Sequence, residues 1–280
     1  MSSTSRGSRP ASWSRALLIA PAFFLVGAVF MLPSVHAASG PEPTSPPSPQ
    51  ATSTARQQPP QGPHYRYPVE PAPLPRGSDV FGTHAAGSQL SFVRLSDGEH
   101  HGTANERFAR PALSLIKLYI ADYVLDKGTA QQRQQALKMV RDSSDSIAAT
   151  LYEAYPEAID ATATRYNLQS TRANSKWGHS VTSTYDVCFF IAQKLEEDPD
   201  SPLLRAMRTA EPVAADGYKQ NFGTSTLPGV EGSKWGWSNS RTLHSSVSFG
   251  KDFVAAAAVS GDAADLTALV DKQLAGLVRQ

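Results

Sequence analysis

Residues 110–125 read RPALSLIKLYIADYVL, and this stretch decides how the rest of the chain is interpreted. From Leu113 to Leu125 the apolar side chains recur at a spacing that predicts a buried helix, which ends at Lys127-Gly128. Ser114 and Lys117 are three positions apart in this helix, so their side chains share one face. A desolvated lysine can take the proton of a serine hydroxyl. The pair is therefore a candidate nucleophile and general base.

A second Ser-x-x-Lys tetrapeptide, Ser248-Phe-Gly-Lys251, tests how specific this signal is. It spans the end of a predicted strand and a turn, where residues i and i+3 do not share a face. We therefore interpret it as a chance match.

The pattern on either side of the 113–125 helix predicts the order of elements along the chain. A strand with alternating apolar residues covers 89–95, and Ser96-Asp97-Gly98 is a turn signal. The segments expected after the first helix are helices over 130–141, 144–155 and 182–197, strands over 233–237, 243–249 and 253–260, and a final helix over 262–278. Asp262 is the expected N-cap of that last helix. This order predicts an α/β arrangement whose closing strands pair antiparallel.

Two further motifs follow Ser114 in the sequence. Ser144-Asp145-Ser146 lies at the start of a predicted helix, and Lys234-Trp235-Gly236 lies on a predicted strand. In this order the motifs resemble the Ser-x-x-Lys, Ser-Asp-Asn and Lys-Thr-Gly set of the penicillin-recognising serine enzymes, most closely the class A β-lactamases. For residues 77–280 the resemblance implies a β-lactamase-like three-layer fold, with an antiparallel sheet and a helical subdomain.

The resemblance also implies a set of site residues. Ser114 would attack a carbonyl group with Lys117 as general base, and the backbone N–H groups of Ser114 and Trp237 would form the oxyanion hole. Ser144 would relay a proton to the leaving group, and Lys234 would orient Ser144 and attract a substrate carboxylate. The expected substrate-binding residues are Ser146, Gly236, Trp237, Ser238, Arg241 and His244.

The implied substrates are small molecules or peptidoglycan peptides, such as D-Ala-ended wall peptides, β-lactams or other acyl compounds. No cofactor and no metal ion is expected, and the chain is expected to act as a monomer.

Three departures from the family pattern bear on activity. Ser146 replaces an asparagine, and Trp235 replaces a hydroxyl residue. Residues 161–185 contain no Asp or Glu, although class A β-lactamases carry a loop glutamate that activates the deacylating water in this region. Two hypotheses therefore remain open, an enzyme that is acylated at Ser114 and deacylates poorly, or a non-catalytic module that binds an envelope component or a protein.

The N-terminal part of the chain predicts export. Arg6, Arg9 and Arg15 precede an apolar run over 16–32, and a small-residue cleavage site ends at Ala37. Residues 1–37 are the expected signal peptide of a secreted or cell-envelope protein, and they would act as a membrane tether only if uncleaved. Residues 38–76 are the expected disordered linker, since 41–76 hold 12 of the 21 prolines.

Composition excludes other classes of function. The net charge of +1 provides no basic face for nucleic acid, and the single cysteine, Cys188, excludes an internal disulfide framework. Cys188 is expected to be a buried thiol, and the adjacent histidines His100 and His101 are expected in a solvated hairpin turn.

Three tryptophans have two open interpretations, groove lining or core packing: Trp177, Trp235 and Trp237. Ser183-Thr-Tyr185 is an alternative to the Ser144 motif, although it fits better as a helix N-cap.

Overall fold

The computed structural model describes Phe81 and residues 87–278. The predicted signal peptide and the whole of the predicted linker lie outside this part of the chain, as do residues 77–80 and 82–86 of the predicted domain. No helix among the described residues is long and apolar enough to cross a bilayer.

The centre of the fold is a five-stranded sheet in the order β2-β1-β7-β6-β5, in which every neighbouring pair is antiparallel. Its strands are β1 (Gln89–Arg94), β2 (His100–Gly102), β5 (Val230–Trp237), β6 (Leu243–Gly250) and β7 (Phe253–Ser260). A small second sheet pairs β3 (Arg110–Pro111) with β4 (Val181–Thr182). The first strand, β1, therefore lies beside the last one, β7, and the three closing strands pair antiparallel as predicted.

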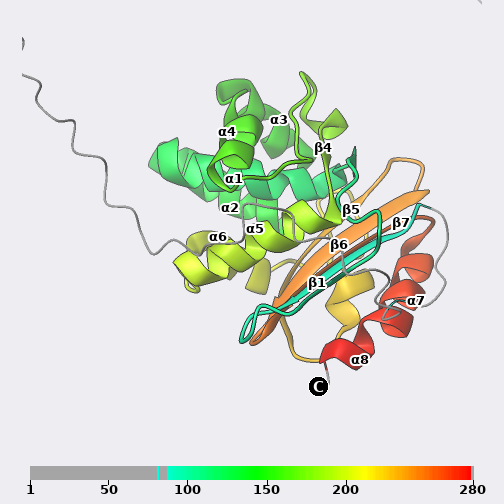
Figure 1. The fold of residues 1–280 in the computed structure, drawn as a ribbon. Coiled ribbons are helices and arrows are strands. Elements are labelled where there is room, and N and C mark those ends of the chain that lie inside the picture. Colours follow the sequence, from blue (N-terminus) through cyan, green and yellow to red (C-terminus); the bar gives the residue numbers. More distant parts are fainter. Residues whose placement is uncertain (1–80, 82–86, 279–280) are drawn as a thin grey trace, which may run out of the picture. The chain divides into compact units, whose positions relative to one another are not determined.

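Helices cover both faces of the large sheet and make a three-layer architecture (Figure 1). The helices on one face are α1 (Ile116–Lys127), α2 (Ala130–Asp142), α3 (Asp145–Ala154), α4 (Ala158–Arg165), α5 (Thr184–Glu197) and α6 (Pro202–Arg208). The other face carries α7 (Ala263–Gln273), α8 (Ala275–Val278) and the 3₁₀ turn η3 (Gly223–Thr226). Two more 3₁₀ turns are η1 (Leu113–Leu115) and η2 (Trp177–His179).

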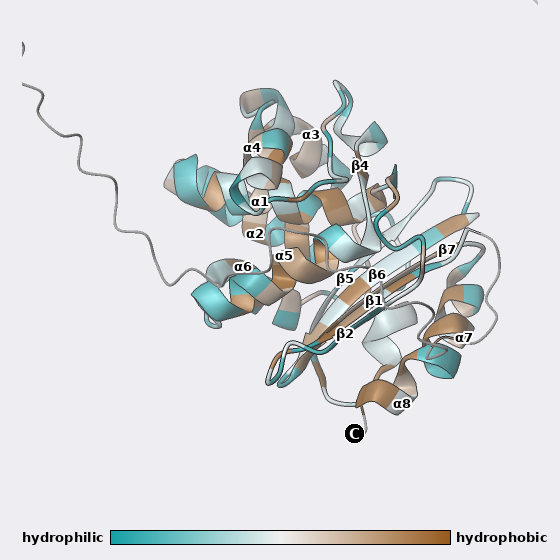
Figure 2. Ribbon diagram, in the orientation of Figure 1, coloured by the Kyte–Doolittle hydropathy of each residue, from teal (hydrophilic) through white to brown (hydrophobic). Residues whose placement is uncertain are grey.

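The central strand β7 explains why the sheet has a core on each side. Val254 and Ala256 pack into the cluster beneath the large helical layer, whereas Ala255 and Ala257 pack into the cluster beneath α7. Side chains alternate between faces along a strand, so a run of buried apolar residues indicates burial on both faces. Figure 2 shows the hydrophobic residues concentrated along the strands and the helix faces that meet them.

Several predicted helix starts are confirmed by their caps. The Asp262 carboxylate accepts hydrogen bonds from the backbone N–H groups of Ala264 and Asp265. Ser183 caps α5 by accepting from the Asp186 N–H, which assigns the Ser183 motif a capping role. Cys188 is fully buried, as expected.

Two predictions are wrong. His100 and His101 lie on β2 rather than in the hairpin turn, because the turn closes earlier, at residues 95–97. The predicted helix over 262–278 is broken at Leu274, so α7 and α8 are separate helices.

Candidate active site

Ser114 lies in the 3₁₀ turn η1, directly before α1, and its neighbour Leu113 has a positive φ of 53°. A positive φ is unfavourable for a leucine, so the surrounding structure must hold this conformation in place. Strand β5 lies against the turn: a Cβ atom at Gly236 would be 2.9 Å from the Ser114 backbone nitrogen. Only a glycine allows the strand to approach the serine this closely.

Lys117 lies in the first turn of α1 and is completely buried. Its Nζ lies 2.9 Å from the Ser114 Oγ, which confirms the predicted proximity of this pair. The same nitrogen contacts the Ser143 carbonyl oxygen and an Asp145 carboxylate oxygen, each at 2.5 Å. Burial lowers the pKa of Lys117 below the ordinary lysine value, while the charge and hydrogen bond of Asp145 act in the opposite direction.

The serine beside this lysine is Ser143 rather than the predicted Ser144. The Ser143 Oγ lies 3.4 Å from the Lys117 Nζ. The Ser144 hydroxyl instead caps α3, where it accepts from the Ile147 N–H, and it bonds the Ser146 hydroxyl at 3.0 Å. Ser143 reaches the lysine because it ends α2 with a left-handed backbone, φ 59°.

Asp145 is a site residue that the sequence analysis did not single out. It is the first residue of α3, its side chain is 71% exposed, and its carboxylate forms an ion pair with the fully buried Lys117. The lysine therefore lies between the nucleophile candidate and a carboxylate that favours its charged form.

Lys234 lies on β5 and is as deeply buried as Lys117, with no exposed surface. Its Nζ has no hydrogen-bond partner among the described residues. Burial first, and then the charge of Lys117, lower its pKa well below the ordinary value. The predicted contact of Lys234 with Ser144 is therefore not formed.

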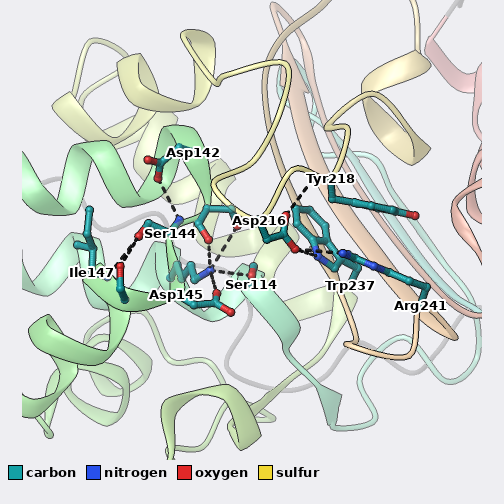
Figure 3. A network of polar contacts seen from close by, with 12 residues as sticks. Ser114, Asp142, Ser144, Asp145, Ile147, Asp216, Tyr218, Trp237 and Arg241 are labelled. Carbon is teal, nitrogen blue, oxygen red and sulfur yellow. Dashed lines mark hydrogen bonds and ion pairs between the residues drawn. The ribbon is translucent and has the colours of Figure 1, made fainter. Parts of the chain in front are cut away.

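A cavity of about 240 Å³ opens in front of Ser114. Its lining residues are Ser114, Ser143, Ser144, Asp145, Ser146, Ala215, Asp216, Trp237 and Asn239. On the wall opposite Asp145, the Asp216 carboxylate accepts from the Trp237 indole N–H at 3.0 Å and pairs with Arg241 at 3.1 Å (Figure 3). The site is thus a polar cleft between the helical layer and the edge strand of the sheet.

This geometry can be compared with known proteins. No family model and no curated protein matches the chain. Solved structures do match. The D-alanyl-D-alanine carboxypeptidase of Mycobacterium tuberculosis H37Rv aligns with a TM-score of 0.54 at 18% identity, over 70% of this chain and 91% of that one. The chain has the fold of the penicillin-recognising serine enzymes.

Two further matches support the assignment of this fold. The cefotaxime-bound penicillin-binding protein D2 of Listeria monocytogenes has a TM-score of 0.54 at 16% identity, over 70% of this chain and 98% of that one. A β-lactamase of Xanthomonas campestris pv. campestris has a TM-score of 0.56 at 14% identity, over 69% and 92%. The predicted fold class is therefore confirmed.

Within this penicillin-recognising fold, the other predicted binding residues lie in different places. Ser146 and Trp237 line the cavity, and Gly236 lies directly behind Ser114. The Ser238 hydroxyl shapes the β5–β6 turn by accepting from the Thr242 and Leu243 N–H groups. These two contacts keep Ser238 out of the cavity lining.

His244 is a correction to the predicted set. It is buried, with its ring nitrogens 2.8 Å from the Gly261 carbonyl oxygen and 2.9 Å from the Tyr218 hydroxyl. Burial lowers its pKa below the ordinary value. His244 therefore supports the back of the sheet and supplies no charge to the cavity.

Trp235 belongs to the core on the α7 side, where its indole N–H donates to the Phe222 carbonyl oxygen at 2.9 Å. Trp177 lies in the segment 161–185, which contains no Asp or Glu. Its ring centroid is 5.0 Å from the Lys117 Nζ. This loop therefore contributes an aromatic ring, and no carboxylate, to the surroundings of the lysine.

The described residues contain no group of His, Cys, Asp and Glu side chains that could hold a metal ion. Five lining residues escaped the sequence analysis: Ser143, Asp145, Ala215, Asp216 and Asn239. The run Ser143-Ser144-Asp145-Ser146 did offer a usable signal, because a second serine, Ser143, directly precedes the Ser144 motif.

Proposed function

We propose that the chain is an exported serine hydrolase that becomes acylated at Ser114. The observation that carries the proposal is the 2.9 Å contact between the Ser114 Oγ and the Nζ of a fully buried lysine. Burial favours the neutral amine, which is the form that can take a proton.

The contacts of Lys117 support one orientation of the amine. The Ser143 carbonyl and the Asp145 carboxylate can only accept hydrogen bonds, so each takes one N–H of the neutral amine. The lone pair is then directed to the Ser114 hydroxyl. Asp145 thus acts as a positioning residue for the base.

The reaction would begin with attack of the Ser114 Oγ on a carbonyl carbon, with its proton passing to the Lys117 Nζ. The backbone N–H groups of Ser114 and Trp237 are the proposed oxyanion donors. Ser143 takes over the proton relay that the sequence predicted for Ser144, since its hydroxyl is the one near Lys117. The leaving group departs with that proton.

Deacylation is expected to be slow. Activation of water needs a general base, and residues 161–185 contain no carboxylate that could serve as one. The two carboxylates that line the cavity are already engaged, Asp145 with Lys117 and Asp216 with Arg241. Losing such a base costs about 10²- to 10⁴-fold in rate. The acyl-enzyme should therefore accumulate.

A reactive acyl or phosphonyl probe should add once per chain, as measured by intact mass. Ser114→Ala should abolish labelling and Lys117→Ala should reduce it steeply, because the nucleophile and its base are removed. Ser248→Ala is the matched control and should label normally, since that hydroxyl is buried in a separate network with Thr224 and Ser233.

The second candidate function is a non-catalytic binding module of the cell envelope. The ion pair between Lys117 and Asp145 favours it, because it stabilises the charged lysine, which cannot act as a base. A wild-type chain that takes up no activated probe would support this alternative.

Export is proposed from residues 1–37, which lie outside the described part of the structure. The mature chain should begin at residue 38 or 39. N-terminal sequencing of the native protein would show Met1 or Ser2 if the segment were retained as an anchor.

A further inference from the structure

The walls of the cavity in front of Ser114 carry negative side chains and no positive ones. Asp145 lies on one side and Asp216 on the other, and no Lys, Arg or His of the described residues lines the cavity. A ligand entering it therefore meets two carboxylates, together with serine hydroxyls, Asn239 and the Trp237 ring.

The two lysines near the cavity are unable to balance a ligand carboxylate. Lys117 is fully buried, and the Asp145 carboxylate already contacts its amine. Lys234, which the resemblance assigns to a substrate carboxylate, has no exposed surface, and its burial favours the neutral amine.

The Arg241 guanidinium is also engaged. It pairs with Asp216 at 3.1 Å and stacks over the Tyr218 ring at 3.9 Å from the centroid. Asp216 is held in place by the Trp237 indole as well. Partial burial acts to raise the pKa of Asp216, but hydrogen bonds from the Tyr218 N–H, Trp237 and Arg241 outweigh it and lower the pKa below the ordinary value. This carboxylate is therefore ionised at neutral pH.

We propose that this site selects uncharged acyl esters or amides and discriminates against acyl donors that bear a carboxylate, with Asp216 as the specificity-determining residue. The inference rests on the proposed acylation of Ser114. Asp216 acts in two ways, since it repels a second carboxylate at the cavity wall and occupies the Arg241 guanidinium.

The test compares two esters of nearly equal size, 4-nitrophenyl butyrate and mono-4-nitrophenyl succinate, in which a terminal methyl group is replaced by a carboxylate. In both reactions the Ser114 Oγ–acyl bond forms, the ester C–O bond breaks, and 4-nitrophenolate leaves while Lys117 takes the serine proton. The burst of nitrophenolate and the intact mass of the acyl-enzyme are measured. The values for Ser114→Ala are subtracted, because the succinate carboxylate also expels 4-nitrophenolate intramolecularly by forming succinic anhydride. Each corrected rate is divided by the rate of the ester with hydroxide.

Butyrate should acylate Ser114 about tenfold faster than succinate on this scale. In Asp216→Asn the butyrate-to-succinate ratio should fall to near one or below, because the repulsion disappears and Arg241 is released. Asp271→Asn, which removes an exposed carboxylate on α7 outside the cavity, should keep the wild-type ratio.

Three outcomes separate the possibilities. Equal acylation by both esters, or an Asp216→Asn ratio identical to wild type, would overturn the selectivity while leaving the proposed function intact. Acylation by neither ester, together with an unlabelled Ser114, would overturn the proposed function and the selectivity with it.

Discussion

Replacing Lys234 by methionine should stabilise the domain, which is unusual for a substitution within a candidate active site. Lys234 has no exposed surface and its Nζ has no partner among the described residues. An unpaired buried polar group costs about 1–3 kcal/mol, and a methionine of similar volume carries no such group. For a domain of this size, 1 kcal/mol corresponds to about 2–4 °C in Tm. We therefore expect Tm to rise by about 2–12 °C.

The gain should also depend on pH, and its sign follows from linkage. Burial holds the pKa of Lys234 well below the ordinary value of 10.5. Between these two values the unfolded chain binds more protons than the folded chain, so the stability of the wild type rises with pH across that window. The advantage of Lys234→Met should thus be largest near neutral pH and should shrink as the pH approaches 10.5.

The assay is thermal unfolding followed by circular dichroism at several pH values, with Lys251→Met as the control. Lys251 is exposed in the β6–β7 turn, so its replacement should leave Tm nearly unchanged. A fall in Tm for Lys234→Met, with the control unaffected, would show that the amine has a stabilising partner and would refute the reasoning.

Three other predictions concern the base, the strand behind the nucleophile and a helix cap. Burial lowers the pKa of Lys117, so the rate of Ser114 acylation, measured with a neutral ester, should rise with pH and reach its plateau below 10.5; a rate independent of pH would contradict this role. Gly236→Ala should reduce acylation at least tenfold, because its Cβ would lie 2.9 Å from the Ser114 nitrogen, whereas Gly178→Ala, with nothing within 4 Å, should be neutral. Asp262→Ala should cost about 1 kcal/mol in chemical denaturation through loss of the α7 cap, and Asp262→Asn should recover most of it; equal losses in both variants would count against the capping role.

Sequence patterns predicted the fold well because it follows from the hydrophobic periodicity of each segment and from the order of the segments along the chain. Alternation over 89–95, the apolar spacing after Leu113 and the cap at Asp262 each reflect a local rule that tertiary packing did not override. The break at Leu274 was missed because a helix pattern contains no signal for where packing interrupts it.

The site was predicted less completely, for a physical reason. Whether Ser143 or Ser144 meets Lys117 depends on which serine caps α3 and which adopts φ 59°, and these choices are made by the join of two helices rather than by the motif. Asp216 lies in a segment between α6 and η3 that has no periodic pattern, and only the folded chain brings it to Trp237 and Arg241. His244 was expected to bind substrate, but its ring is buried beside the Tyr218 and Phe222 rings.

The central claim is that Ser114 is a working nucleophile, and intact mass after incubation with a fluorophosphonate tests it most directly. The account predicts one phosphonyl adduct per chain, located on Ser114 by peptide mapping and lost in Ser114→Ala. An unchanged mass in the folded wild-type protein, or an adduct on any other residue, would contradict it.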